Sequence, residues 1–302
     1  MSIPTIGTID LIQASLQKLH HPEIESRGLA VSVLRLDKIH PVISGNKWFK
    51  LRHYLEKARQ EKRRGIATFG GPWSNHLLAT ALATRLEGLA AIGFIRGEKP
   101  VHSNVLLNEL EDYGMQLHYL SRQDYANRNI SSCLPNAEDY LLINEGGAGI
   151  LGVQGAADIH HLLPEGRFET ICCAVGTGTT MAGLAARAKA GQQIIGFSSL
   201  KIQPGNDIEQ YVRQHAINTS LEFIYTYHFG GYGRMNKELL DFMDAFYRQT
   251  NIPSDRVYTA KLFYGFIEEV KKDRFFRSGE ICLIHSGGLS GNRSLEPGIL
   301  SY

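Results

Sequence analysis

The chain has 302 residues, of which 43% are hydrophobic, so it is long enough for one large or two ordinary domains with real cores. These values exclude a disordered or fibrous protein. Lys plus Arg total 32 and Asp plus Glu total 30, which leaves a formal charge of +2. A chain this close to neutrality has no broad basic surface for nucleic acid or for anionic membranes. We therefore expect neither among its partners.

The longest apolar run, Gly88–Ile95, is far shorter than the roughly 20 residues of a membrane-spanning helix. Met1–Gln13 has no basic region ahead of an apolar block, so it is not expected to be a signal peptide. The cysteines lack the C-x-x-C spacing of metal sites, and Cys172 and Cys173 lie in an apolar run. We expect no metal, no disulfide framework and a reducing, cytoplasmic location.

In chain order, the first expected strand is Ala30–Leu36, which we assign to the sheet that the later part of the chain builds. From residue 66 onward, short β-like runs alternate with helix-like segments, the pattern of βαβ units and parallel sheets. The first compact unit is expected to consist of the strand Ile66–Phe69, the helix Asn75–Glu87, the strand Leu89–Ile95, the helix Asn104–Tyr113 and the strand Gln116–Leu120.

Between the units, Tyr125–Pro135 is polar and irregular, while Gly146–Gly149 is typical of a hinge or of backbone close to a ligand. We expect Asp139–Asn144 to begin a second, larger α/β sheet. Its further segments are Val153–Leu163, Glu169–Val175, Thr180–Ala190, Gln193–Ser198, Ile208–Gln214, Leu221–Tyr227, Met235–Thr250, Ala260–Lys272 and Glu280–His285. Boundaries near residues 48 and 150 predict a small domain, 48–149, inserted into a large domain made of 1–47 and 150–302. The predicted fold class is α/β, with two doubly wound, mainly parallel sheets.

The strongest local signal is Ala174–Gly183, where a strand ends in glycines and hydroxyls and a helix of small residues begins. Glycines let backbone N–H groups approach a phosphate, and Thr177, Thr179 and Thr180 add hydroxyl donors near the positive end of a helix dipole. A P-loop would require Gly-Lys-Ser/Thr, and a dinucleotide site an acidic residue after the next strand; the sequence has neither. The segment therefore favours a cofactor monophosphate over a pyrophosphate, with an ordinary glycine-rich turn as the alternative.

A second signal is Lys47, which stands between a glycine–asparagine turn and an aromatic pair in Ser44–Leu51. Partial desolvation there would lower its pKa and suit it for Schiff-base chemistry. Taken alone, the segment is better explained by a solvated lysine in the first turn of a helix, with Trp48 packed below.

The third signal is Phe69–His76, where another strand ends in glycines and Ser74 precedes a helix as an N-cap residue does. The amides at that helix start form a second anion site, of a size that suits a carboxylate. A plain helix cap with two turn glycines explains Ser74 equally well. Two anion sites and one poised lysine together indicate a phosphorylated carbonyl cofactor and an amino-acid substrate.

At these three segments the chain resembles the fold type II, tryptophan-synthase-β-like family of pyridoxal-phosphate enzymes. Within it, the chain looks like the group of D-cysteine desulfhydrase and 1-aminocyclopropane-1-carboxylate deaminase. The motifs occur in family order over most of the chain: Gly45-Asn-Lys-x-x-Lys-Leu51, Gly70-Gly-x-x-Ser-Asn-His76, Gly146-Gly147, Val175–Gly183, Phe229-Gly-Gly-Tyr-Gly233, Val257-Tyr-Thr259 and Ile284-His-Ser-Gly-Gly288. The resemblance implies pyridoxal 5'-phosphate as cofactor, bound by the large domain, and a homodimer.

The resemblance also implies which residues bind the cofactor. Lys47 resembles the lysine that forms the Schiff base and then removes the α-proton, and Lys50 resembles a structural lysine. Asn75 resembles the asparagine that binds the phenolic oxygen of the cofactor. The phosphate cradle corresponds to Gly176, Thr177, Gly178, Thr179 and Thr180.

On the substrate side, Ser74 and the amides around Asn75 and His76 resemble the site for the substrate carboxylate. Ser74 also resembles a residue that acts in proton transfer. Tyr232 and Tyr258 resemble the two active-site tyrosines near the substrate and the ring.

Two positions separate the subfamilies in this resemblance. Thr259, at the position that contacts the pyridine nitrogen, stands where the deaminases have a glutamate that keeps this nitrogen protonated. Ser286 stands where the deaminases have leucine, and both hydroxyls are typical of the desulfhydrases. The chain departs from the family pattern at Trp48-Phe49, at Leu77-Leu78 and at Gly146–Gly149, which alters the surroundings of the cofactor site.

The sequence therefore predicts a pyridoxal-phosphate lyase that acts on a small amino acid by β-elimination and releases a keto acid and ammonia. The alternatives are 1-aminocyclopropane-1-carboxylate deamination and a homologue without turnover that only binds the cofactor or an amino acid.

Overall fold

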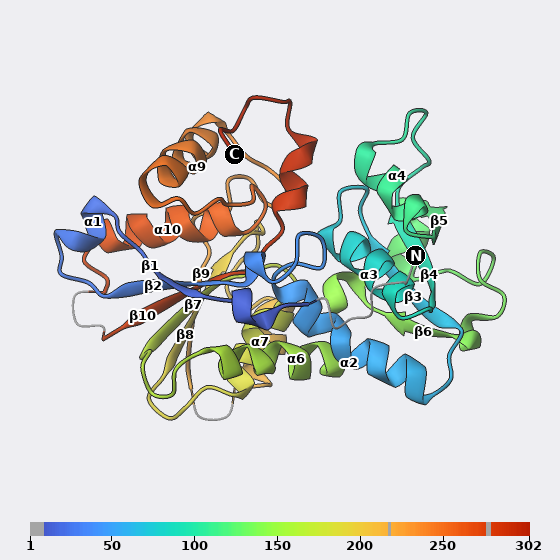
Figure 1. Cartoon of the computed structure of the whole chain (residues 1–302), viewed down its shortest axis with the longest axis horizontal. Helices are drawn as coiled ribbons and strands as arrows, with labels where there is room; N and C mark the ends of the chain where they lie inside the picture. The colour runs from blue at the N-terminus through green and yellow to red at the C-terminus, as the bar shows by residue number, and fades with distance from the viewer. Residues whose placement is uncertain (1–8, 217–218, 276–278) are drawn as a thin grey trace.

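Two β-sheets, each flanked by helices, form the two lobes of the molecule in Figure 1. The computed structural model describes residues 9–216, 219–275 and 279–302. Residues 1–8 lie outside the described ranges, and with them most of the Met1–Gln13 segment discussed above. None of the helices in these ranges combines the length and the apolar character that a membrane span requires.

The larger sheet has six strands in the order β1-β2-β10-β7-β8-β9, and all neighbours run parallel except β1 and β2. Its strands are β1 Leu16–Lys18, β2 Val31–Arg35, β7 Thr170–Val175, β8 Gln193–Ser198, β9 Ser220–Ile224 and β10 Ile281–His285. Helices α1 Pro22–Glu25, α9 Lys237–Thr250 and α10 Thr259–Lys271 lie on one face, and α6 Ile150–Ala157, α7 Thr179–Ala186 and α8 Asp207–Arg213 on the other (Figure 1). Because both faces are covered, β2, β7 and β10 are buried at every position.

The smaller sheet has four parallel strands in the order β5-β4-β3-β6. They are β3 Gly65–Gly70, β4 Ala90–Arg96, β5 Met115–Leu120 and β6 Tyr140–Ile143. Helices α3 Asn75–Leu86 and α4 Val105–Asp112 bury their apolar sides against one face, and α5 Arg122–Asn127 covers the other. The two mainly parallel sheets confirm the predicted fold class.

The expectation that Asp139–Asn144 begins the larger sheet is wrong. This segment forms β6, which pairs with β3 in a parallel register that sets Tyr140 opposite Gly65. Apolar residues reveal that a segment is extended, but they do not select its partner, and β6 is an edge strand that is only half buried. The Tyr125–Pro135 segment is also not irregular throughout, because it contains the end of α5, which Ser121 caps.

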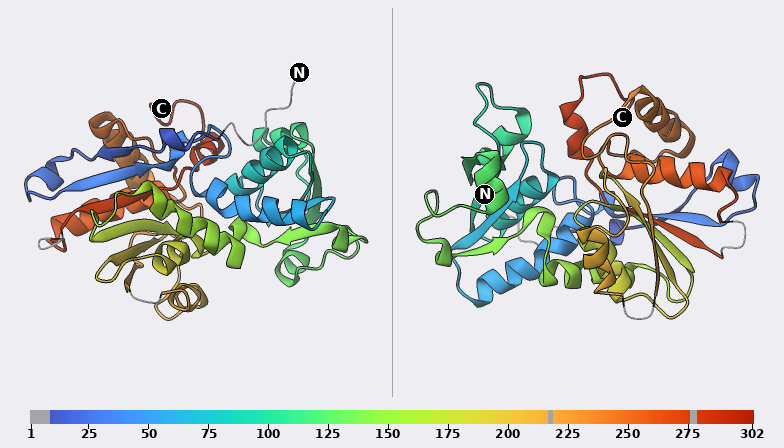
Figure 2. Two further views of the ribbon diagram at one scale, coloured as in Figure 1. Left: turned by 60° about the horizontal axis from the view of Figure 1, so that its bottom comes forward. Right: turned by 180° about the vertical axis from the view of Figure 1, so that it is seen from behind.

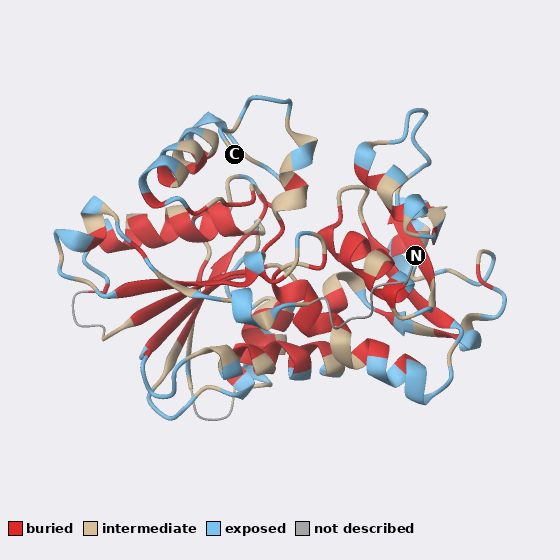
Figure 3. Ribbon diagram, in the orientation of Figure 1, coloured by how far each residue is buried: buried red, intermediate tan, exposed pale blue. Residues whose placement is uncertain are grey.

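Helix α2 Asn46–Gln60 joins the two lobes, as both views of Figure 2 show. Leu51 and Leu55 of this helix belong to one hydrophobic core that also contains Ile66 of β3 and Ile171 of β7. Figure 3 shows the buried residues running from one sheet to the other through this region. Helix α2 is therefore held by both sheets, and any side chain at its start lies between them.

Candidate active site

A cavity of about 410 Å³ lies between the two sheets, at the carboxyl ends of their parallel strands. Its walls come from the ends of β3, β4 and β6 in the smaller sheet and of β7, β8 and β10 in the larger one. This edge of an α/β sheet is where ligands bind. The sequence-predicted residues that line it are Lys47, Ser74, Asn75, His76, Gly176, Thr177, Gly178, Thr180, Tyr232, Tyr258 and Ser286.

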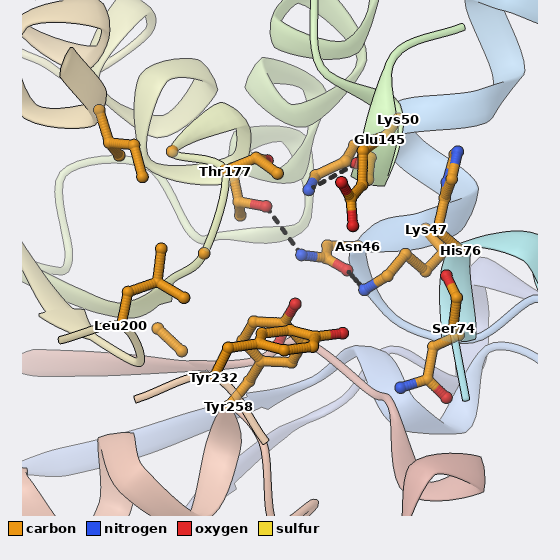
Figure 4. Close-up of a pocket in the computed structure, with 18 of the residues that line it drawn as sticks. Asn46, Lys47, Lys50, Ser74, His76, Glu145, Thr177, Leu200, Tyr232 and Tyr258 are labelled. Carbon is orange, nitrogen blue, oxygen red and sulfur yellow. Dashed lines mark hydrogen bonds between the residues drawn. The ribbon is translucent and has the colours of Figure 1, made fainter. Parts of the chain in front are cut away.

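Lys47 lies in the first turn of α2 and reaches into the cavity (Figure 4). Its Nζ donates to Asn46 Oδ1 at 2.6 Å and lies 5.7 Å from the centre of the Tyr258 ring. Burial lowers the pKa of Lys47 to about 8, and the negative charge of Asp255 limits this fall. A substantial share of Lys47 is therefore uncharged just above neutral pH, and the uncharged amine is the form that attacks a carbonyl carbon.

Asn46 is a site residue that the sequence analysis did not single out. Its Oδ1 accepts from Lys47, and its Nδ2 donates to Thr180 Oγ1 at 2.7 Å. One carboxamide thus links the lysine of α2 to the first turn of α7, through the two hydrogen bonds drawn from Asn46 in Figure 4. Its signals in the sequence were its place directly before Lys47 and the Gly45-Asn-Lys motif that contains it.

The loop between β7 and α7 presents glycine backbone to the cavity. Gly176 has no room for a side chain, because a Cβ there would lie 2.8 Å from Cε1 of Tyr258. The hydroxyls of Thr177 and Thr179 hydrogen-bond each other at 2.9 Å, and Thr179 itself does not line the cavity. Helix α7 begins at this loop, so its first amides face the same space as the glycines.

Lys50 lies one turn beyond Lys47 and also lines the cavity. Its Nζ donates to the Gly146 carbonyl at 3.2 Å, and a Cβ on Gly146 would touch Thr177 at 3.0 Å. Burial, and next the charge of Lys47, hold the pKa of Lys50 well below its ordinary value. An anion bound beside Lys50 would raise this pKa again and favour the charged form of the lysine.

Ser74 caps α3, since its Oγ accepts from the Leu77 N–H at 3.2 Å. The Ser74 proton is not used in that contact and remains available for donation into the cavity. Asn75 Oδ1 accepts from the Ser290 hydroxyl, which leaves Asn75 Nδ2 as a donor. The start of α3 therefore offers a hydroxyl, a carboxamide and free helix amides, a set of donors that suits an anion.

His76 is a neutral imidazole with one defined tautomer. Its Nε2 lies 2.9 Å from Thr68 Oγ1, whose single proton goes to the Ile143 carbonyl, so Nε2 carries the hydrogen. Nδ1 is a buried acceptor with no hydrogen-bond partner among the described residues. Burial, and next the charges of Lys50 and Lys47, lower the pKa of His76 to about 3.

Tyr258 and Tyr232 form an aromatic wall, with ring centres 6.1 Å apart and planes at 66°. Burial raises the pKa of both hydroxyls, that of Tyr258 well above its ordinary value, so both act as donors. Arg96 and Glu145 also line the cavity, from the ends of β4 and β6. The sequence analysis missed these two charged residues because neither lies in a recognisable functional pattern.

Thr259 does not line the cavity. Its hydroxyl accepts from the Asp255 N–H at 2.7 Å and donates to Asp255 Oδ1 at 2.9 Å. Asp255 also accepts from the N–H groups of Val257 and Tyr258, so one buried carboxylate fixes the start of α10. The sequence analysis missed this carboxylate, because Asp255 lies outside the usual N-cap position of the helix.

Residues 16–287 match the protein family described as "Pyridoxal-phosphate dependent enzyme". The chain is 30% identical to the "Putative 1-aminocyclopropane-1-carboxylate deaminase" of Pyrococcus abyssi, over 87% of this chain and 86% of that protein. It is 28% identical to the bifunctional D-cysteine desulfhydrase/1-aminocyclopropane-1-carboxylate deaminase, mitochondrial, of Arabidopsis thaliana, over 82% of this chain and 70% of that protein. The crystal structure of an ACC deaminase homologue superposes with a TM-score of 0.78 at 25% identity, covering 96% of this chain and 94% of that one.

Proposed function

We propose that this chain, which belongs to the family of pyridoxal-phosphate dependent enzymes, eliminates the β-substituent of a small amino acid and releases a keto acid and ammonia. The observation that carries the proposal is Lys47, a buried and partly uncharged amine between two sets of anion-binding donors. One set lies at the start of α7 and the other at the start of α3. Deamination of 1-aminocyclopropane-1-carboxylate is the second candidate, because relatives of the chain are named for it.

The residues of the cavity fit the cofactor. The chemistry that pyridoxal phosphate supplies is an aldehyde that condenses with amines and a ring that accepts electrons from the carbon next to the amine. Its phosphate would be held by the amides of 176–180 and by Lys50, whose depressed pKa would rise again beside an anion. Asn75 Nδ2, the donor that Ser290 leaves free, would bind the phenolic oxygen.

The chain's own residues would then handle substrate and protons. After the amine of the substrate has replaced Lys47 on the cofactor, the free Lys47 amine would take the proton from the α-carbon. The Ser74 hydroxyl and the first amides of α3 bind the carboxylate, which keeps the α-carbon within reach of Lys47. Tyr258 and Tyr232 stay protonated and donate hydrogen bonds toward the departing group. Closing the small domain, 48–149, on the large domain, 1–47 and 150–302, would exclude water during these steps.

Two hydroxyl residues support elimination over ring opening. Thr259, which does not line the cavity, has a neutral hydroxyl whose hydrogen is already donated to Asp255, so it would not protonate the ring nitrogen of the cofactor. A less electron-withdrawing ring suffices when the β-substituent is itself a good leaving group. Ser286, which lines the cavity, adds a hydroxyl at the position where, in the family resemblance, the deaminases have leucine.

The proposal predicts that β-chloroalanine and cysteine give keto acid and ammonia faster than the cyclopropane amino acid does. Both enantiomers of cysteine and of serine belong in the assay, because the side from which Lys47 approaches the α-carbon decides which enantiomer reacts. Keto acid and ammonia are measured side by side with purified holoenzyme. Faster ring opening would reverse the order of the two candidates, and keto acid from none of the compounds would favour a binding protein without turnover.

We also expect cofactor capture by the apo-protein to depend on pH through Lys47. Its pKa of about 8 lies below the ordinary value of a lysine, so the reactive uncharged amine increases through the neutral range. The rate of cofactor uptake, followed by stopped-flow absorbance, should rise about tenfold per pH unit up to about pH 8 and then level off. A rate that keeps rising to pH 10 would mean that Lys47 has an ordinary pKa.

We further propose a homodimer located in the cytoplasm. Cys172, Cys173 and Cys282 are free and buried, and burial raises the pKa of Cys173 to about 12, so these thiols suit a reducing compartment without being reactive. The family resemblance supports the dimer. Light scattering on the purified protein decides it, by returning either the chain mass of 33.6 kDa or twice that value.

A further inference from the structure

Lys261 on α10 is a lysine without any solvent exposure, and it does not line the cavity. Its Nζ donates to three backbone carbonyls: Gly231 at 2.7 Å, His228 at 2.8 Å and Ser199 at 3.3 Å. An ammonium has three N–H donors, so every donor has a partner. Burial lowers the pKa of Lys261 to about 8, and the charge of Asp255 opposes this, so the ammonium remains the main form at neutral pH.

The three carbonyls belong to two loops that form the cavity wall. Ser199 directly precedes Leu200, and Gly231 directly precedes Tyr232; Leu200 and Tyr232 both line the cavity. The two loops lie close together, since a Cβ added to Gly231 would be only 3.4 Å from Lys201. A single ammonium below them thus joins the loop after β8 to the loop that carries Tyr232.

The second loop has an unusual backbone conformation. Phe229, Gly230, Gly231 and Gly233 all have positive φ values, which a residue such as Phe229 rarely adopts. Within the loop, the N–H groups of Gly230 and Gly231 donate to Nδ1 and to the carbonyl of His228. From the other side, the Arg256 guanidinium donates to the Gly233 carbonyl at 2.7 Å. Two cations therefore fix this loop through its carbonyl groups.

We propose that the Lys261 ammonium is a built-in cation that holds the two loops together and thereby positions Tyr232 and Leu200 for the reaction. It is a positioning residue, since its side chain touches neither the cavity nor Lys47. The expected loss of reaction rate rests on the proposed function. The structural part of the proposal does not: three carbonyl groups point at one positive charge, so another small cation can take the place of the lysine ammonium.

Lys261→Ala tests the proposal, because it removes the charge and leaves a carbonyl-lined space for a small ion. We expect kcat/KM to fall roughly 10²-fold while cofactor absorbance persists, since Lys47 is untouched. Ammonium or potassium chloride should restore roughly a tenth of the lost rate or more, and tetramethylammonium chloride at equal ionic strength should not.

Two control variants accompany this test. Lys261→Met should show the same loss of rate, and small cations should not restore it, because the methionine side chain fills the space. Lys271→Ala, an exposed lysine of the same helix, is the matched control with unchanged rate.

Hydrogen exchange of the apo-protein gives a second readout that needs no cofactor. Amides of 228–234 should exchange faster in Lys261→Ala than in the wild type, and ammonium should slow them again. If the protein does not catalyse the proposed reaction, no rate can be measured, but hydrogen exchange still tests the role of Lys261. If Lys261→Ala does not fold, unchanged loop exchange in Lys261→Met overturns the proposal and faster exchange supports it. A folded Lys261→Ala with wild-type rate and exchange, or with a loss that no small cation reverses, would also overturn it.

Discussion

Replacing Lys47 with alanine is expected to abolish covalent cofactor attachment and turnover. The variant lacks both the amine that condenses with the aldehyde and the base that takes the α-proton. Loss of the base alone corresponds to a fall in rate of roughly 10²–10⁴-fold. Borohydride reduction followed by peptide mass spectrometry should find the cofactor on Lys47 in the wild type and no labelled peptide in the variant, together with loss of the visible absorbance band.

Other lysines serve as controls for this experiment. Lys57→Ala lies on the same helix α2 with an exposed side chain, and it should keep both label and rate. Lys50→Ala should bind the cofactor more weakly, because a cation near the phosphate is lost, yet still carry the label on Lys47. A label on Lys50 or Lys261 in the wild type would refute the assignment of Lys47.

Much of the fold could be predicted because buried parallel strands give apolar runs and the helices between them begin with capping residues. Asn206 and Asn236, for example, cap α8 and α9 close to their predicted starts. The pairing of β6 with β3 could not be predicted, since pairing depends on how the whole chain collapses. The length of helix α2 could not be predicted from the sequence either. This helix buries Lys47 and Lys50 among aromatic residues, so it lacks the polar–apolar pattern of a surface helix.

For the cavity, too, residues in local sequence motifs could be predicted, and residues that depend on contacts between distant parts of the chain could not. Residues in contiguous motifs, such as Lys47 and Ser74, could be identified from sequence and do meet in space. Lys261 could not, because its three acceptors lie 30 or more residues away along the chain. Glu145 was missed for a similar reason, since only the arrangement of β6 beside β3 brings it to the cavity.

Gly45→Ala is expected to destabilise the protein strongly and to displace Lys47. Gly45 has φ +65°, and a Cβ there would lie 1.9 Å from the carbonyl oxygen of Ser286, so the backbone must move. The same oxygen accepts from the Asn46 N–H at 3.2 Å, which sets where α2 begins. Gly45 also has ψ −145°, which together with its positive φ lies in a backbone region that is essentially restricted to glycine, so an alanine there costs about 1–3 kcal/mol. Overpacking costs about 1–3 kcal/mol more, so the free energy of unfolding should fall by about 2–6 kcal/mol in urea titrations.

Gly28→Ala serves as the control for a positive φ without a steric contact. Gly28 has nearly the same φ, +62°, but nothing lies within 4 Å of its added Cβ, so only the left-handed strain of about 1–2 kcal/mol applies. Only Gly45→Ala should also lower kcat, because Lys47 follows two residues later and moves with the start of α2. Equal losses of stability in the two variants would show that the start of α2 can shift away from Ser286. The position of Lys47 would then depend on the packing of α2 and on the hydrogen bonds of Asn46 to Lys47 and Thr180.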